Sequence, residues 1–186
     1  YNGPASVDIL TNDLGNFGTG GSLTDADSVA ITVTAVNDAP TQTAPATQTT
    51  PEDTTLVFSS ANGNLIAVAD VDDADNAIAG DEIVQVTLTA TVGTLTLSST
   101  FGLDFTFAAD ADGVGAGTGV RDITRTFRGT LANVNAAMNG LSFAPNLNAV
   151  GAASVSILTK DLGNFGTGGT LTASNTVAIN ITPVND

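Results

Sequence analysis

Apolar and polar residues alternate along several short runs of this chain, and the runs are rich in Val, Ile, Thr and Leu. In each run the apolar side chains fall on one face and Thr, Ser or Asn on the other, which is typical of antiparallel strands with one face in water. The runs cover residues 29–34, 83–90, 94–97, 123–128, 154–159 and 177–182. This alternation predicts an all-β fold, an antiparallel β-sandwich.

One segment has a different period. Between residues 131 and 140, Leu131, Val134 and Met138 fall on one side of a helix, and Gly140 is a plausible stop. The sequence therefore predicts one short helix within the sandwich.

A long internal repeat divides the chain. The 34 residues from Ala5 to Asp38 match those from Ala153 to Asp186 at a spacing of 148 residues, and 24 of the 34 are identical. This period is too long for a solenoid unit of about 20 to 50 residues and suits a whole domain. We expect residues 1–38 to be the C-terminal strands of a preceding repeat and residues 39–186 to be one complete repeat, in a natural sequence that runs on beyond both ends.

The nonapeptide DLGNFGTGG is unchanged between the two copies, at residues 13–21 and 161–169. Its four glycines supply the positive φ angles of a tight loop, and its Asp and Asn can bond their own backbone there. We interpret the nonapeptide as a structural loop between two strands, with a binding loop as the alternative.

Charge and composition exclude several classes of partner. Four basic and nineteen acidic residues give a net charge of −15, whereas nucleic acids and anionic membranes bind clustered Lys and Arg. The sequence has no run of 18 apolar residues, so no membrane insertion is predicted. It has no cysteine for a disulfide framework.

The residue types present make an enzyme an unattractive interpretation. Histidine, cysteine and tryptophan are absent, which removes the usual general bases and the thiol nucleophile. A pair of carboxylates can still catalyse glycoside hydrolysis. However, one Tyr and eight Phe offer few rings for stacking on sugars, which also argues against a carbohydrate-binding module.

Carboxylates gather around the boundary between the two copies. They follow Val36 at Asp38, flank the Pro- and Thr-rich stretch at Glu52, and recur between Asp70 and Asp75. If these groups converge they repel one another, and Ca2+, which accepts six to eight oxygen ligands, relieves that repulsion. From spacing alone, a calcium site and a solvated acidic loop both remain open. The segment is not an EF-hand, because Asp75 stands where that loop requires glycine.

The ordered set of motifs resembles a known family. VNDAP, PEDTTLVFS, IAVADVDDAD, VTLTATVGTLTL, TFRGTLANVNAAMNGLSFAPN, DLGNFGTGG and VAINITPVND together resemble the cadherin-like tandem repeats of large secreted bacterial adhesins of the RTX type. The resemblance covers residues 39–186. It implies cadherin-like, Ig-like β-sandwiches that are stiffened by Ca2+ and joined end to end on the bacterial cell surface.

The resemblance also implies a set of calcium ligands. By analogy with the cadherin linker DxNDN and its DxD partner, Asn37 and Asp38 are linker ligands, and Asp70 and Asp72 complete the junction from the following domain. Glu52 resembles the early acidic residue that cadherins point at a junction, without indicating which one. The full candidate set is Asn37, Asp38, Glu52, Asp70, Asp72 and Asp75. The linker is shorter than DxNDN and a DRE-type motif is missing, so one or two ions per junction are expected rather than three.

The expected function is structural. The chain is expected to be a Ca2+-stiffened extracellular module that extends a bacterial surface adhesin for cell–surface or cell–cell adhesion, with neighbouring repeats of the same chain as partners. The alternative is a subunit of an extracellular fibre, sheath or matrix filament, in which identical chains exchange strands. A carbohydrate-binding module is the less favoured third interpretation. The sequence does not indicate the target of the adhesin.

Overall fold

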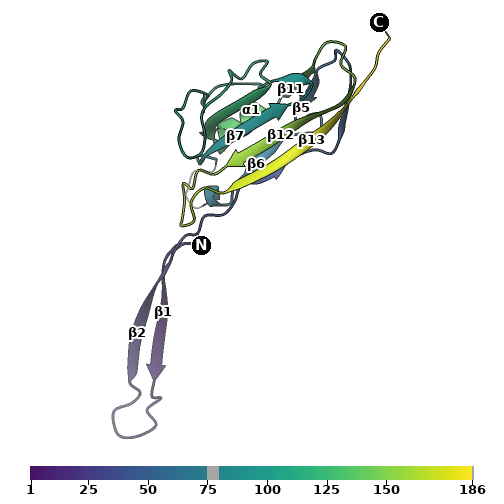
Figure 1. Cartoon of the computed structure of the whole chain (residues 1–186). Helices are drawn as coiled ribbons and strands as arrows, with labels where there is room; N and C mark the ends of the chain where they lie inside the picture. Colours follow the sequence, from purple (N-terminus) through teal and green to yellow (C-terminus); the bar gives the residue numbers. More distant parts are fainter. Residues whose placement is uncertain (75–79, 186) are drawn as a thin grey trace. The chain divides into compact units, whose positions relative to one another are not determined.

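Two units make up the chain in this computed structural model, Tyr1–Val36 and Asn37–Asp186 (Figure 1). The structure describes residues 1–74 and 80–185. Asn37 and Asp38 belong to the second unit by their contacts.

The first unit is a single antiparallel hairpin. Strand β1 (Gly3–Asn12) pairs with β2 (Thr24–Val33) over ten residues, from Gly3 opposite Val33 to Asn12 opposite Thr24. The first copy of the nonapeptide lies in the loop between these strands. No other strand pairs with either of them within the described chain.

A six-stranded sheet forms one layer of the second unit. The strands follow the order β4 (Gln48–Pro51), β13 (Thr172–Thr182), β12 (Gly151–Lys160), β7 (Ile83–Ala90), β10 (Thr124–Thr130) and β9 (Leu103–Asp104). Its pairs are antiparallel apart from β4, which runs parallel to β13. Strand β4 contains Pro51 and lies at the edge, where a residue without an N–H is tolerated.

The second layer is a smaller sheet with a helix beside it. It has the order β5 (Leu56–Phe58), β11 (Leu141–Pro145) and β8 (Gly93–Thr96), while β3 (Thr41–Thr43) pairs with β6 (Ala67–Ala69). A short 3-10 helix, η1 (Asp72–Ala74), follows β6. Over the described residues, the structure thus confirms the predicted all-β sandwich with one short α-helix.

The predicted helix is α1 (Leu131–Met138), with Thr130 as its N-cap. Its buried face includes Leu131, Val134 and Met138. Asn135 fixes the helix to β6, because its amide accepts a hydrogen bond from Val68 N at 2.9 Å and donates one to Val68 O at 2.8 Å.

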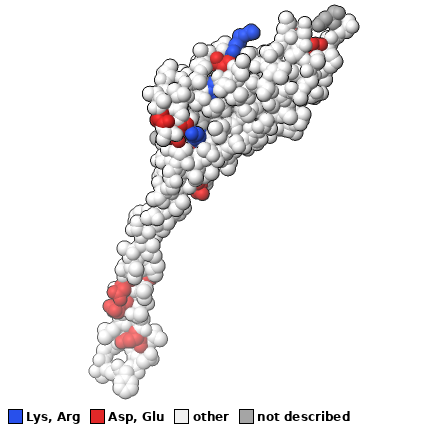
Figure 2. Space-filling view, in the orientation of Figure 1, with Lys and Arg blue, Asp and Glu red and all other residues white. Residues whose placement is uncertain are grey.

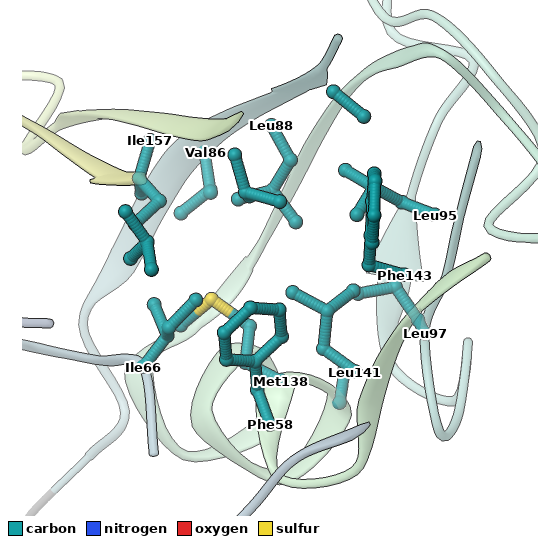
Figure 3. Close-up of a cluster of buried hydrophobic side chains, with 14 of the residues drawn as sticks. Phe58, Ile66, Val86, Leu88, Leu95, Leu97, Met138, Leu141, Phe143 and Ile157 are labelled. Carbon is teal, nitrogen blue, oxygen red and sulfur yellow. The ribbon is translucent and has the colours of Figure 1, made fainter. Parts of the chain in front are cut away.

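The core lies between the two layers, as Figure 3 shows. Phe58, Ile66 and Met138 approach from the side of the smaller sheet and the helix, and Val86 and Ile157 from the large sheet. All five side chains are buried. This alternation of buried and wet positions is what gives β7 and β12 their period of two.

A buried arginine fixes the glycine-rich segment before β10. The Arg125 guanidinium donates to Gly119 O at 2.9 Å and to Leu95 O, and lies 3.7 Å from the Asp122 carboxylate. The Asp122 carboxylate in turn accepts the backbone N–H of Thr118 at 2.9 Å. One charged side chain therefore ties β8 to the loop and to β10.

Strand β13 connects the two ends of the sandwich. It starts after the second copy of the nonapeptide and ends beside Pro51. Its 11 residues span about 33 Å at roughly 3.3 Å per residue. We call the end with the nonapeptide loop the linker pole and the end beside Pro51 the far pole.

Candidate metal centre

The second nonapeptide forms a loop that a single carboxylate closes. Asp161 Oδ1 accepts the backbone N–H groups of Gly163 at 2.9 Å and Leu171 at 2.8 Å. Gly163 has a φ of 62°, and a Cβ at that position would meet Gly169 C at 2.8 Å, so glycine is required there. The expected tight loop is therefore present, and Asp161 is fully buried within it.

Asn37 anchors the start of the second unit to this loop. Its side-chain Nδ2 donates to Asp161 Oδ2 at 2.7 Å and to Gly169 O at 2.9 Å, and its backbone N–H donates to Thr167 O at 3.0 Å. Asn37 is buried, and its Oδ1 has no hydrogen-bond partner among the described residues. An acceptor oxygen therefore remains available at the linker pole.

The next acidic residues join the same pole. Asp38 N donates to Asp72 Oδ2 at 2.7 Å, and Asp72 N donates to Asp70 Oδ1 at 3.1 Å. Asp70 and Asp72 are both buried, and Asp70 Oδ2 has no partner in the described structure. The structure thus brings together Asn37, Asp38, Asp70 and Asp72, four of the six residues that the sequence suggests.

The carboxylates of Asp73 and Glu82 lie close to those of Asp70, Asp72 and Asp161. We call these residues, with Asn37 and Asp38, the acidic cluster. Asp73 accepts the backbone N–H groups of Gly80 at 2.5 Å and Glu82 at 3.1 Å. Both side-chain oxygens of Glu82 are buried and accept no hydrogen bond within the described chain. Beside them lies an open pocket of about 280 Å³, lined by Asp72, Asp73, Asp81, Glu82, Ile83, Asn164 and Phe165.

The ion pairs of the described chain join Arg and Lys to Asp110, Asp112 and Asp122, and none of these carboxylates belongs to the acidic cluster. Burial raises the pKa of Asp70, and the negative charges of Asp72, Asp161 and Asp38 add to this effect. Burial also raises the pKa of Glu82 to about 7, together with the neighbouring carboxylates. Figure 2 shows acidic groups on both units and basic groups only on the second, since residues 1–120 contain neither Lys nor Arg.

Glu52 lies at the far pole and not in this cluster. Its backbone N–H donates to Thr182 O at 2.8 Å, and its Oε1 accepts the N–H of Val184 at 2.7 Å. It therefore faces the segment that follows β13, the counterpart of the segment that precedes Asn37. Asp75, the sixth candidate, falls outside the described residues.

Sequence reasoning did not include Asp161, Asp73 or Glu82 among the ligands. A signal for Asp161 was present, because it opens a nonapeptide that recurs without change. Glu82 carries no comparable signal, since it follows Asp81 directly before β7 and lies outside the repeated segment. It reaches the cluster through the fold.

The described residues contain no three acidic side chains that already stand as a metal-binding group. Nor does the described chain have a helix with the length and apolarity to cross a bilayer. A scan against models of protein families finds no match, and a search of the curated proteins finds no relative.

Proposed function

We propose that this chain is a Ca2+-binding structural repeat that extends a bacterial surface adhesin. The observation that supports this function is the group of buried oxygens at the linker pole that accept no hydrogen bond from any described residue, namely Asn37 Oδ1, Asp70 Oδ2 and both carboxylate oxygens of Glu82. An unpaired buried carboxylate is costly unless a cation or a proton neutralises it. A calcium ion would supply that charge.

The chemistry of the donors fits a hard cation. All of the candidate ligands offer carboxylate or amide oxygens, and the sequence has no His or Cys, which favours Ca2+ over zinc or copper. Asn37, Asp70, Asp72, Asp161 and Glu82 are the residues that would hold the ion, with Asp38 beside them. Binding requires these carboxylates to move closer together, because their mutual repulsion keeps them apart otherwise.

The position of the cluster gives it a mechanical role. Asn37 and Asp38 form the start of the sandwich, and their side-chain and backbone bonds tie this segment to Asp161 and Asp72. A cation held by the same groups would stiffen the connection to a neighbouring repeat. Glu52, whose Oε1 accepts the N–H of Val184, would serve the next connection in the same way.

This proposal makes the chain a spacer that acts outside the cell and not an enzyme. Neighbouring repeats of the same chain are its partners, and the adhesive target would be bound elsewhere in the adhesin. One observation favours the fibre alternative as a second candidate. The first unit has an exposed apolar face, formed by Val7, Ile9, Val29, Ile31 and Val33.

Calorimetry with and without calcium tests the proposal. Ca2+ at a hundredfold excess over Kd adds about 2.7 kcal/mol to the free energy of unfolding. For a domain of this size that corresponds to a rise in Tm of roughly 5 to 10 °C. Asp72→Asn should reduce this rise, and Asp72→Ala should reduce it further.

Two variants serve as controls for that measurement. Asp25→Ala changes an acidic residue on β2 of the first unit, and Glu52→Gln changes one at the far pole, so both should retain the calcium-induced rise. A wild-type Tm that does not respond to calcium, or equal losses from Asp25→Ala and Asp72→Ala, contradicts a site at the linker pole.

A further inference from the structure

The chain contains two hairpins of nearly the same sequence in two different environments. The pairing of β12 with β13, from Gly151 opposite Ile181 to Lys160 opposite Thr172, repeats the register of β1 with β2 at an offset of 148 residues. In the second unit this hairpin is part of the sandwich. In the first unit both strands face solvent.

The exposed fractions of equivalent apolar side chains differ between the two hairpins. Five side chains on one face of the first hairpin are 37% to 52% exposed, and their counterparts in the sandwich are at most 2% exposed. The five pairs are Val7 and Val155, Ile9 and Ile157, Val29 and Val177, Ile31 and Ile179, and Val33 and Ile181. Four of these pairs are identical, and the fifth differs by one methylene. The first hairpin thus presents an apolar face, and the second unit shows which elements bury the equivalent face.

In the second unit, the equivalent face is buried by neighbouring strands and by the core. Strand β12 pairs with β7 over six residues, from Val155 opposite Ala90 to Lys160 opposite Gln85, and β13 pairs with β4. Beneath them lie the core side chains of β7 and of the smaller sheet (Figure 3). We use the name repeat body for the part of the second unit that precedes β12, residues 37–74 and 80–150.

We infer that the β1–β2 hairpin is a donor surface for the repeat body of a second copy of this chain, where it takes the place of β12 and β13. The β1 edge and the five apolar side chains then meet the same groups that β12 and β13 meet in the sandwich. This inference does not depend on calcium, and it concerns an interaction that the spacer function does not require.

The same geometry excludes this exchange within one chain. If β1 and β2 replaced β12 and β13 on their own repeat body, Val33 would take the position of Ile181 at the far pole. Asp38 N donates to Asp72 Oδ2 at 2.7 Å, and Asp72 belongs to the repeat body, so this bond holds Asp38 at the linker pole whichever hairpin is docked. The linker pole lies about 30 Å along β13 from the position of Ile181, and the five residue steps from Val33 to Asp38 reach at most about 18 Å. While Asp38 keeps this bond, the hairpin does not replace β12 and β13 of its own repeat body.

We call the β12–β13 hairpin the resident hairpin. In the wild-type chain it outcompetes a hairpin from another molecule. Strands β12 and β13 are covalently attached to their repeat body, so their effective concentration exceeds that of a hairpin from another molecule. Exchange becomes visible when the resident hairpin is weakened and the first hairpin is left intact.

Matched double substitutions on the full chain test the inference by light scattering and circular dichroism in EDTA. Val155→Asp with Ile157→Asp weakens the resident hairpin, and Val7→Asp with Ile9→Asp weakens the first hairpin at the equivalent positions. The first variant should assemble to at least twice the monomer mass, and the second should remain a folded monomer. Combining all four substitutions should abolish the assembly. A folded monomer from the first variant, or equal assembly by the combined variant, overturns the inference.

A mixing experiment covers the case in which the first variant does not fold. The chain with all four substitutions is isotopically labelled and mixed with an excess of unlabelled wild type, whose first hairpin is free to be donated. Dispersed amide signals should appear in the labelled chain. The Val7→Asp, Ile9→Asp chain, which lacks a competent donor, should not restore them. Labelled signals that stay collapsed with the wild type, or recover equally with both partners, refute donation by β1 and β2.

Discussion

Asp13 and Asp161 occupy the same position of the repeated loop and make the same backbone contacts. Asp13 Oδ1 accepts the N–H groups of Gly15 at 2.9 Å and Leu23 at 2.8 Å, the same distances as Asp161 has to Gly163 and Leu171. The bonds from Leu23 and Gly15 lower the pKa of Asp13. Only Asp161 has a further bond, from Asn37. The loop is therefore a local structure, and its role in the cluster comes from its surroundings.

This pair gives a matched prediction for stability. Asp161→Ala removes the acceptor of two backbone N–H groups and of Asn37, and should lower the free energy of unfolding of the sandwich by about 2 to 3 kcal/mol. Asp13→Ala should leave that transition unchanged, because its loop lies in the other unit. Urea denaturation followed by circular dichroism measures both. Equal effects of the two substitutions would contradict a specific role for Asp161.

Glu82 predicts a pH dependence in calcium-free buffer. Its pKa is raised from 4.5 to about 7 in the fold, so between these values the folded protein holds a proton that the unfolded chain has released. The free energy of unfolding should therefore fall as the pH rises from about 4.5 to about 7. Glu82→Gln should flatten this decline by on the order of 1 kcal/mol, after allowing for solvent screening of a partly exposed group.

Denaturation in EDTA at about pH 5 and about pH 8 measures the effect of Glu82. Excess calcium should weaken the decline in the wild type, because a bound cation offsets the repulsion. A Glu82→Gln chain with the pH profile of the wild type would show that another group is responsible.

Strands of regular alternation were predictable from the sequence, and short ones were not. Strands β7, β10, β12 and β13 fall where the period of two is sustained. Strands β3, β5 and β6 have three residues each, too few to show a period. Strand β4 contains Pro51, and it forms because the neighbouring β13 supplies a parallel partner.

The same limit applies to the site. Asp70 and Asp72 were identifiable because they lie close together along the chain. Asp161 lies 89 residues after Asp72 and 79 residues after Glu82, and it joins them only through the fold. Spacing cannot indicate such a meeting, because strand order decides it.

Arg125 supplies a prediction for the elements that it connects. Removing a buried ion-pair partner that also donates to two carbonyls leaves Leu95 O and Gly119 O without that donor.

 
Arg125→Ala should therefore lower the free energy of unfolding by about 3 kcal/mol or more, since breaking a buried ion pair typically costs this much. Arg125→Lys should recover only part of the loss, because a lysine cannot reach Leu95 O, Gly119 O and Asp122 with one planar group.

Thermal denaturation of the two Arg125 variants checks this prediction, and Arg121→Ala is the control. Arg121 lies in the same loop and is exposed, so its loss should shift the midpoint little. Comparable losses from Arg121→Ala and Arg125→Ala would show that the loop is not held by the buried guanidinium.

At the scale of the whole molecule, the proposed calcium site should control how freely the two units move. Small-angle scattering of the full chain should give a larger radius of gyration and a more flexible profile in EDTA than in calcium, because the segment at Asn37 and Asp38 is then held less firmly. Circular dichroism should show that the strands remain. The Asp72→Asn chain in calcium should resemble the wild type in EDTA, whereas Glu52→Gln should not. Identical scattering of the wild type in both buffers would contradict stiffening by calcium.

The short connection between Val33 and Asp38 has a consequence for synthesis. In an array of such repeats, each repeat body leaves the ribosome before its own β12 and β13, while the closely similar hairpin of the repeat before it is already made. That earlier hairpin is the nearest wrong partner and would be captured first if the chain allowed it. Once Asp38 has bound Asp72 of the repeat body, the five residue steps after Val33 are too few for the earlier hairpin to reach the far pole. The short connection would therefore prevent consecutive repeats of similar sequence from exchanging their final strands.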